Sequence, residues 1–501
     1  MPHPSFSLLA AFILNGALAH VTEVSNRCCT ILTLSTLSKQ VTYPNQTAYE
    51  ASLSSYFDGK SRLTPNCIVQ PTSAEEVSTV VKLLTASNYS EPCQFAVRSG
   101  GHTPIPGSNN VDDGVTIDLL YMNGTTYNAD TQLASISPAA RWGSVYAALE
   151  PLGRMVPGGR GSTVGVGGYL LGGGISHYAA LVGLSCDNVV NFEVILADGR
   201  IANANQTTNP DLFTALKGGN NNFGIVTRYD METFESEDLW GGIVTYPSST
   251  ADQHFQALVN FGLNPNRDPH AAIIVFQGYS TASATDVVRV AFDYTKPIPY
   301  PNAYQEFFAV TNNISDTTKI QPMSAVAAEF ASTTTTRVQF RTLSFKLDLA
   351  TLQETARLYK ILITELQAKA SGSWRVSCLH QIWSTRYTAN STIRGGNVLG
   401  MDRFTQNFIM YQSYLSWSDA GDDELFINLG LMLTDGIQKF ATEQGTLVDY
   451  LYLNYADKDQ DPLSAYGADE VVFMKEVARK YDALGVFQTL LPGGFKISKV
   501  L

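Results

Sequence analysis

One short stretch, Arg98-Ser99-Gly100-Gly101-His102, places a cation, two glycines and an imidazole between two β-like runs at 95–97 and 115–120. Glycine lets the main chain adopt positive φ angles and come close to a ligand, so successive N–H groups can point at an anion. Arg98 would add positive charge to such a site, and His102 would lie where the loop meets the bound group. The stretch therefore predicts an anion-binding loop with a histidine at its edge.

Glycine is even denser at 157–177, which holds nine glycines in twenty-one residues. A glycine inside a helix or strand costs about 0.5–1 kcal/mol, so this density favours a loop around a bound cofactor. A nicotinamide-binding Rossmann motif would need G-x-G-x-x-G after a strand, but Leu170 stands where the third glycine belongs. The full P-loop signature G-x-x-x-x-G-K-[S/T] is also absent, because Ser54 stands where its first glycine would precede Gly59-Lys60-Ser61. Two glycine-rich loops far apart in the chain suit a long dinucleotide.

Several motifs occur in a consistent order along almost the whole chain. They are R-S-G-G-H (98–102), T-V-G-V-G-G and G-G-G (163–174), C-D-N-V (186–189) and K-G-G-N-N-N-F-G-I-V (217–226). Others lie at 394–400, 452–457, 460–462 and 486–496. With these motifs the sequence resembles the flavoproteins related to vanillyl-alcohol oxidase, and most of all the fungal berberine-bridge-enzyme-like oxidases.

The resemblance implies that the bound anion is the pyrophosphate of FAD. It also implies an α+β fold, in which a two-part FAD-binding domain of the vanillyl-alcohol oxidase (PCMH) type carries an inserted α+β substrate domain built on an antiparallel sheet. We expect a signal peptide at 1–19, the FAD-binding domain at 20–239 with its core at about 63–235, the substrate-binding domain at 240–445, and a segment at 446–501 that returns to the FAD-binding domain.

His102 gains a specific role from the resemblance. A loop histidine taken alone is more often hydrogen-bonded to its neighbours, but the histidine of R-S-G-G-H in the family bonds covalently to the 8α-methyl carbon of the flavin. Relatives with a second covalent bond have a cysteine where this chain has Gly161, so we expect a single bond. Tyr169 replaces a histidine that is frequent in the family near the flavin ring. The other residues expected at the cofactor are Arg98, Ser99, Gly100, Gly101, Thr103, Gly161, Thr163, Val164, Gly165, Gly167, Gly168, Gly173, Gly174, Ile225, Val226 and Asn454.

Dehydrogenation of an alcohol needs a base that takes the proton while the hydride leaves. The N-Y-x-D pattern near the C-terminus resembles the family in a way that indicates Tyr455 as this base. If 452–455 is a regular strand, Tyr452 and Tyr455 face opposite sides, so only one of them reaches the flavin. Core packing is the alternative role for either tyrosine. We expect Gln381 and Asn397 on the cavity wall, with His380 on the opposite face of its strand, and local backbone bonding for His177.

Periodicity supports a second domain after residue 240. Long β-like runs are predicted at 271–278, 287–294, 338–347, 374–383 and 407–417, with helices at 252–262, 350–368 and 422–444. Strands with helices on one face form an antiparallel α+β layer. In the first domain, Ser73 and Glu76 predict a capping box for a helix with Val77, Val80, Val81 and Leu84 on its buried side.

The ends and the cysteines indicate the secretory pathway. An apolar run at 6–18 ends in Ala17-Leu18-Ala19, which is typical of a cleaved leader, and six N-x-[S/T] sequons follow at Asn45, Asn88, Asn123, Asn205, Asn313 and Asn390. Four cysteines lie in the first hundred residues, Cys28, Cys29, Cys67 and Cys93. They predict two disulfides; adjacent cysteines rarely pair, so two pairings stay open. Cys186 is expected to be buried and reduced.

The chain of 501 residues has a net charge of −12 and no lysine or arginine runs. Such a charge disfavours nucleic acid and anionic membranes as partners. No C-x-x-C or H-x-x-x-H spacing indicates a metal site. Together with these features, the family resemblance implies a secreted FAD-linked oxidase whose partners are a small molecule and O₂, with H₂O₂ as product. A fungal specialised metabolite is the preferred substrate class; a mono- or oligosaccharide, or a non-redox cyclase or binding role, are the alternatives.

Overall fold

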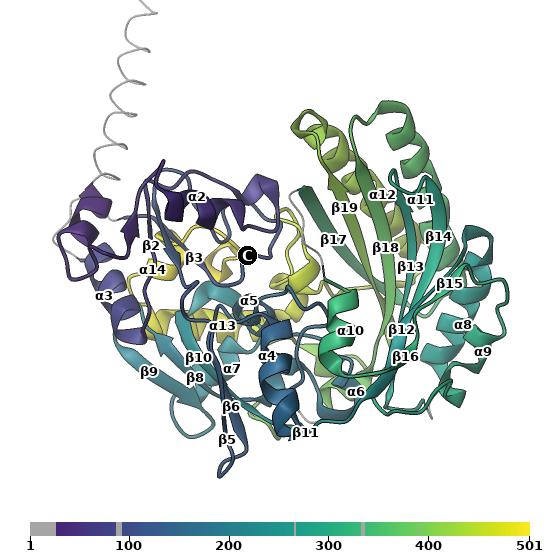
Figure 1. Ribbon diagram of the computed structural model, residues 1–501, viewed down its shortest axis with the longest axis horizontal. Coiled ribbons are helices and arrows are strands. Elements are labelled where there is room, and N and C mark those ends of the chain that lie inside the picture. The colour runs from purple at the N-terminus through teal and green to yellow at the C-terminus, as the bar shows by residue number, and fades with distance from the viewer. Residues whose placement is uncertain (1–26, 87–92, 265–266, 332–335, 390) are drawn as a thin grey trace, which may run out of the picture.

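The structure is a computed structural model that describes residues 27–86, 93–264, 267–331, 336–389 and 391–501. The predicted leader and the sequons at Asn88 and Asn390 lie outside the described residues. Two lobes stand side by side, and the chain enters and leaves through the same one (Figure 1). No described helix is both long and apolar enough to cross a membrane.

Two sheets form the first lobe. One has the order β1-β2-β4-β3, in which β4 runs parallel to both neighbours; its strands are β1 (Val41–Thr42), β2 (Cys67–Val69), β3 (Phe95–Arg98) and β4 (Val115–Asp118). The other is antiparallel with the order β5-β6-β10-β8-β9; its strands are β5 (Thr125–Asn128), β6 (Leu133–Ile136), β8 (Val189–Ile195), β9 (Ile201–Asn205) and β10 (Ile225–Glu232). A small pair joins β7 (Arg154–Met155) to β11 (Phe234–Glu235).

Short helices pack around these sheets: α2 (Thr47–Ser54), α3 (Ala74–Leu84), α4 (Trp142–Leu149), α5 (Val166–Leu171), α6 (Ala179–Val182) and α7 (Pro210–Leu216). Helix α3 begins as predicted, because the Ser73 hydroxyl accepts a hydrogen bond from the Glu76 N–H. The reciprocal half of the box is replaced: the Glu76 carboxylate accepts from the N–H of Thr72. The four predicted core residues of α3 are fully buried.

The second lobe is built on a nine-stranded antiparallel sheet with the order β15-β12-β14-β13-β18-β19-β17-β20, and β16 also pairs with β12. Its strands are β12 (Leu239–Pro247), β13 (Ala271–Ser280), β14 (Thr285–Tyr294), β15 (Ser315–Asp316), β16 (Lys319–Gln321), β17 (Arg337–Lys346), β18 (Trp374–Trp383), β19 (Phe408–Trp417) and β20 (Leu447–Val448). The five long runs predicted from the sequence are all strands. The fold class is confirmed as α+β.

Side chains alternate between the two faces of this sheet. One face, with Val275, Val290 and Tyr411, packs against the helices on the outside of the lobe (Figure 1). The opposite face, with Phe276, Leu379 and Gln412, looks toward the first lobe and lines a cavity. The helices are α8 (Ala251–Leu263), α9 (Gln305–Phe308), α10 (Met323–Glu329), α11 (Leu349–Lys369) and α12 (Asp423–Glu443), with α10 at the junction of the lobes (Figure 1).

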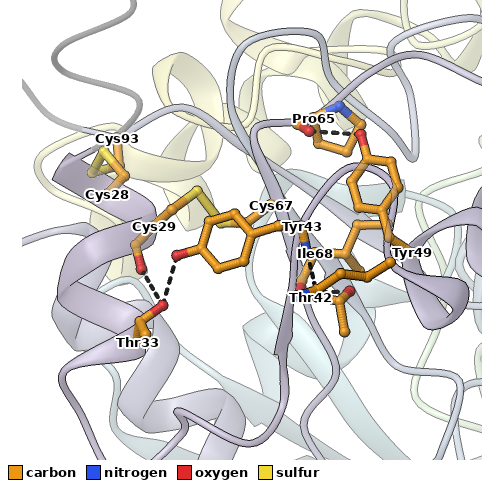
Figure 2. The surroundings of a disulfide bond; sticks show 11 residues. Cys28, Cys29, Thr33, Thr42, Tyr43, Tyr49, Pro65, Cys67, Ile68 and Cys93 are labelled. Atoms are coloured by element: carbon orange, nitrogen blue, oxygen red, sulfur yellow. Dashed lines mark hydrogen bonds between the residues drawn. A yellow bond between two sulfur atoms is a disulfide. The ribbon is translucent and has the colours of Figure 1, made fainter.

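Two disulfides hold the N-terminal segment to the first lobe (Figure 2). Cys28 pairs with Cys93, and Cys29 pairs with Cys67. This finding decides between the two pairings that the sequence left open. Cys186 is a buried free thiol, as predicted.

The same N-terminal segment also bridges the two lobes, through residues 57–60. The Phe57 N–H donates to the carbonyl of Gly101 at 3.1 Å. Asp58 accepts from the Val338 N–H at 2.9 Å, and Lys60 donates to the Val338 carbonyl at 2.5 Å. Residues 57–60 therefore connect the His102 loop to strand β17 of the second lobe.

The last part of the chain lies in the first lobe, with α13 (Ala468–Tyr481) and α14 (Val486–Thr489) drawn in yellow (Figure 1). Phe487 and Leu491 are buried in the cluster that contains Cys28 and Val77. Residues 452–455 do not form the regular strand in which Tyr452 and Tyr455 would face opposite sides. Residues Leu453–Tyr455 form a 3-10 turn, in which the N–H of Tyr455 bonds to the carbonyl of Tyr452 at 2.9 Å.

Candidate active site

A cavity of about 500 Å³ lies between the two lobes. Both glycine-rich loops form one wall, the inner face of the large sheet forms another, and residues 452–456 close one end. Of the residues predicted at the site, most line this cavity: Ser99, Gly100, Gly101, His102, Thr103, Gly161, Val164, Gly165, Gly167, Gly168, Ile225, Val226, Tyr452, Asn454 and Tyr455. Six do not: Arg98, Thr163, Gly173, Gly174, Gln381 and Asn397.

The two glycine-rich loops touch each other through their glycines. A Cβ added to Gly100 would stand 2.5 Å from the Cα of Gly165, and one added to Gly165 would stand 2.5 Å from the Cα of Gly100. No larger residue fits at either position without a backbone shift. A Cβ on Gly168 would meet no atom within 4 Å, so this part of the loop is open toward the cavity that it lines.

Arg141 connects the two loops, a role that no motif in the sequence predicts. Its guanidinium donates to the carbonyl of Gly100 at 2.9 Å and to the carbonyl of Thr163. Thr163 thereby contributes its backbone to the loop structure. Gly173 and Gly174 form the turn after α5 with positive φ angles of 99° and 80°. A side chain would also find no room there, because a Cβ on Gly173 would meet Leu399 and a Cβ on Gly174 would meet Tyr169.

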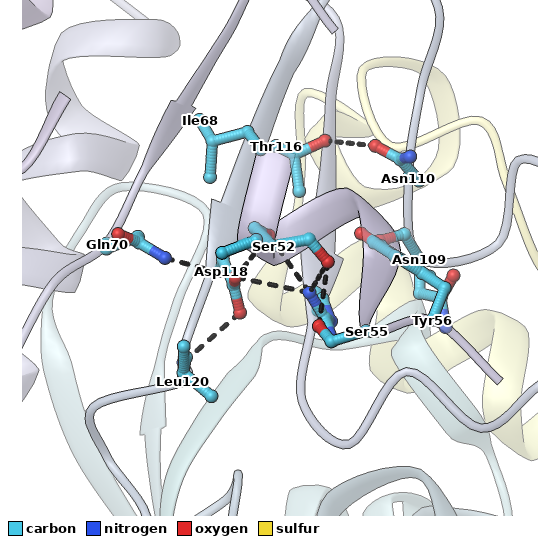
Figure 3. Close-up of polar contacts among 12 residues, drawn as sticks. Ser52, Ser55, Tyr56, Ile68, Gln70, Asn109, Asn110, Thr116, Asp118 and Leu120 are labelled. Atoms are coloured by element: carbon cyan, nitrogen blue, oxygen red, sulfur yellow. Dashed lines mark hydrogen bonds and ion pairs between the residues drawn. The ribbon is translucent and has the colours of Figure 1, made fainter. Parts of the chain in front are cut away.

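The prediction that Arg98 adds charge to the anion site does not agree with its contacts. Its guanidinium is buried beside Asp118 at 3.4 Å and donates to the hydroxyl groups of Ser52 and Ser55. Figure 3 shows Asp118 among Ser52, Ser55 and Gln70, beneath the strand. Because the Asp118 carboxylate neutralises it within this network, Arg98 supports the loop from behind.

His102 is held between the lobes by stacking. Its ring lies 4.0 Å from the ring of Phe57 at an interplanar angle of 15°. Burial, with a smaller effect of the Arg141 charge, lowers the pKa of His102 to about 4. The imidazole is therefore neutral at physiological pH, and its buried Nε2 has no hydrogen-bond partner among the described residues.

Arg160 is the main site residue that the sequence interpretation missed. It is partly buried and lines the cavity, and its guanidinium donates to the Tyr455 hydroxyl at 2.6 Å and to Oε1 of Gln381 at 2.6 Å. None of the described carboxylates forms an ion pair with it. The signal was present: a lone arginine in the glycine run P-G-G-R-G is hard to explain by packing.

Tyr452 and Tyr455 lie together, because the 3-10 turn replaces the expected strand. Their ring centroids are 5.0 Å apart, and both line the cavity. The two tyrosines therefore line the same cavity, whereas a regular strand would direct them to opposite sides. They differ in environment: burial and the neighbouring tyrosines raise the pKa of Tyr452 well above its ordinary value, so it stays a neutral phenol. Its oxygen accepts a hydrogen bond from Asn454, which also donates to the Tyr169 carbonyl.

Three other predicted side chains take different places. Gln381 reaches the site through Arg160, while His380 lies on the opposite face of β18 and contacts Thr355 of α11, as expected. Asn397 donates to Asp187 instead of lining the cavity. The expected local backbone bond of His177 is wrong: its Nδ1 lies 3.2 Å from Asp293 of β14, across the lobe junction.

The site fits FAD. Touching glycine loops form a close backbone wall, an open glycine faces the cavity, and a neutral histidine offers a buried, unpartnered nitrogen at its rim. Residues 65–205 match the family described as FAD binding domain.

Relatives in sequence share nearly the whole chain. It is 40% identical over 481 residues to the FAD-dependent monooxygenase drtC of Aspergillus calidoustus, covering 95% of this chain and 91% of that protein. It is 40% identical over 479 residues to the FAD-dependent monooxygenase sdcF of Emericella nidulans, covering 95% and 99%. It is 30% identical over 491 residues to the bifunctional solanapyrone synthase of Alternaria solani, covering 97% and 91%.

Solved structures share the fold at low identity. A xylooligosaccharide oxidase from Myceliophthora thermophila in complex with xylobiose superposes with a TM-score of 0.74 at 22% identity, covering 92% of this chain and 97% of that one. The 6-hydroxy-D-nicotine oxidase from Arthrobacter nicotinovorans gives 0.74 at 20%, covering 89% and 96%. Glycine loops, cavity and relatives agree, and the chain belongs to the FAD-dependent oxidoreductases of the vanillyl-alcohol oxidase family, in the berberine-bridge-enzyme-like branch.

Proposed function

We propose that the chain oxidises a carbon–hydrogen bond of a small specialised metabolite, with Tyr455 as the proton acceptor and O₂ as the final electron acceptor, which is reduced to H₂O₂. Bound FAD supplies the hydride acceptor. The single observation that carries this proposal is the hydrogen bond of 2.6 Å between Arg160 and the Tyr455 hydroxyl inside the cavity.

Arg160 makes Tyr455 the better base of the two tyrosines. A cation at hydrogen-bonding distance favours the charged form of an acid, and the surrounding tyrosines raise the pKa of Arg160 further, so the guanidinium stays protonated. Tyr452 remains a neutral phenol that can donate to a substrate oxygen. Gln381 holds the second branch of the guanidinium and fixes its plane. Arg160 and Tyr455 are therefore arranged so that the Tyr455 oxygen can accept a proton.

We also propose a covalent bond between His102 and the flavin. A neutral imidazole keeps a lone pair for bond formation, and the low pKa of about 4 leaves His102 neutral at any physiological pH. Stacking on Phe57 fixes the ring plane. Gly161 has no side chain that could form a second bond.

Secretion is a third part of the proposal. It rests on the leader-like sequence, on two disulfides that are typical of oxidising compartments, and on exposed sequon asparagines at Asn45, Asn123 and Asn313. Asn205 is a poorer acceptor for a glycan, because its amide nitrogen donates to Asn191.

Anaerobic titration of the holoenzyme tests the reaction. Aromatic and polyketide-like alcohols are expected to bleach the flavin absorbance, and admission of air should restore it with one H₂O₂ per turnover. Bleaching by oligosaccharides alone would move the substrate class to sugars. Transfer of ¹⁸O from labelled O₂ into the product would instead assign the monooxygenase activity for which the relatives are named. A flavin that stays oxidised while substrate is converted would assign a non-redox role.

A further inference from the structure

The inner face of the large sheet carries two arginines that the proposed reaction does not use. Arg289 of β14 and Arg375 of β18 both line the cavity. They share a face, because Arg289 stands opposite Phe276 in β13, and Phe276 stands opposite Leu379, an even number of residues from Arg375. Two arginines, on strands β14 and β18 that flank β13, therefore line one cavity from the same face of the sheet.

Neither arginine has a carboxylate partner among the described residues. Arg375 donates to the Tyr414 hydroxyl at 3.1 Å and lies over its ring at 4.9 Å. Burial, together with the positive charge of Arg375, lowers the pKa of Arg289. The two guanidinium groups therefore repel each other electrostatically. The protein as a whole is acidic, with a net charge of −12.

Arg289 is partly buried, whereas Arg375 is exposed. Two arginines of β17 in the same sheet are neutralised. Arg337 pairs with Asp423, and Arg341 pairs with Asp459 at 2.6 Å. Glu329 does line the cavity, but its carboxylate accepts hydrogen bonds from Thr317 and Gln321. The cavity therefore carries positive charge that no ion pair among the described residues neutralises.

We propose that Arg289 and Arg375 form an anion subsite for a carboxylate of the substrate. The proposal rests on the function proposed above and adds the chemical class of the molecule. A carboxylate between the two guanidinium groups would relieve their repulsion and accept charge-assisted hydrogen bonds.

The strand register places this subsite away from the reaction centre. Arg375 precedes Gln381, the partner of Arg160, by six residues on β18, which is roughly 20 Å at the rise of a β-strand. Arg289 lies nearer, level with Leu379. Phe276, Leu379 and Phe340 line the space between. The substrate class is thus an elongated acid with an apolar body, oxidised at the end remote from its carboxylate.

Equilibrium binding tests the subsite without turnover. Holoenzyme is titrated calorimetrically with 8-phenyloctanoate and with 8-phenyloctan-1-ol, which has the same body without the charge. The parent is expected to bind the carboxylate about tenfold more tightly, as for one or two hydrogen bonds to a charged group, and the preference should weaken as ionic strength rises. Equal binding of the two probes, including no measurable binding of either, would overturn the proposal.

Variants then assign the preference to the two arginines. R289Q and R375Q should each reduce it several-fold, the double variant should abolish it, and R289K should retain most of it. R357Q is the matched control, since Arg357 is exposed on α11 and pairs with Glu354. Visible spectra confirm that each variant holds its flavin. A preference that survives in the double variant contradicts the subsite, whereas failure of the proposed reaction would appear only in flavin reduction.

Discussion

Arg160 and Tyr455 are joined by a hydrogen bond of 2.6 Å between residues that are 295 positions apart in the chain. Arg160 comes from a glycine-rich loop of the first lobe, and Tyr455 comes from the segment that returns from the second lobe. The bond therefore forms only when the chain has passed into the second lobe and returned to the first. Variants of Tyr455 and of Arg160 test its role.

Replacing Tyr455 by phenylalanine removes the proton acceptor and leaves the ring. Anaerobic flavin reduction in a stopped-flow instrument is expected to slow by about 10²–10⁴-fold, the usual contribution of a general base. The Tyr452→Phe variant is the matched comparison, because Tyr452 is a neutral phenol, and a smaller loss is expected. If the two variants slow equally, Tyr455 is not the specific base.

Replacing Arg160 by methionine removes the cation beside the base. The pH–rate profile of flavin reduction is expected to move to higher pH, because the charged form of the base loses the electrostatic stabilisation of the neighbouring guanidinium. Arg160→Lys should restore part of the shift. Gln381→Met keeps the cation and should leave the profile nearly in place. A purely structural Arg160 would change the amount of folded holoenzyme with no movement of the profile.

Replacing His102 by alanine removes the proposed point of attachment. Acid precipitation of the parent should leave the flavin in the pellet, and precipitation of the variant should release it to the supernatant. Mass spectrometry of the peptide around His102 should show the added flavin mass in the parent only. Release of all flavin from the parent would disprove the covalent bond and leave FAD binding itself untouched.

Asp293 gives a pH dependence of stability. Burial raises the pKa of its carboxyl to about 8, against about 3.9 in an unfolded chain. Between these values the folded protein holds a proton that the unfolded chain releases, so the free energy of unfolding declines as pH rises through the window. Asp293→Asn should remove this decline. The gain in thermal midpoint of the variant over the parent should therefore grow from pH 5 to pH 8, and a constant gain would contradict the raised pKa.

Local signals predicted the regular elements well. The apolar stripe of Val77, Val80 and Val81 marks α3, and long alternating runs mark the strands of the large sheet. The turn at Leu453–Tyr455 escaped, because its sequence is compatible with a strand and only tertiary contacts select the 3-10 form. The role of Arg98 was not predicted for the same reason. Its partner Asp118 lies at the end of a neighbouring strand, and no local sequence pattern indicates that the two side chains are buried together.

The family motifs predicted the two glycine-rich loops of the cavity wall, but they did not predict the residues that connect these loops to each other and to the C-terminal segment. Arg141 and Arg160 stand outside any periodic pattern, and their contacts span 41 and 295 residues. The disulfide pairing was likewise undecidable, since Cys28 and Cys29 are neighbours and only the three-dimensional path of the chain distinguishes their partners.

The ring beneath His102 belongs to a segment that begins at two oxidised cysteine pairs and continues across to β17. Synthesis in a reducing cytosol would leave that segment without its covalent anchors, and Phe57 would no longer be fixed under the imidazole. Attachment of the flavin should then lag behind chain collapse. With the proposed attachment at His102, we expect maturation of the holoenzyme to depend on thiol oxidation, and recombinant yield of yellow protein should follow the redox state of the host compartment.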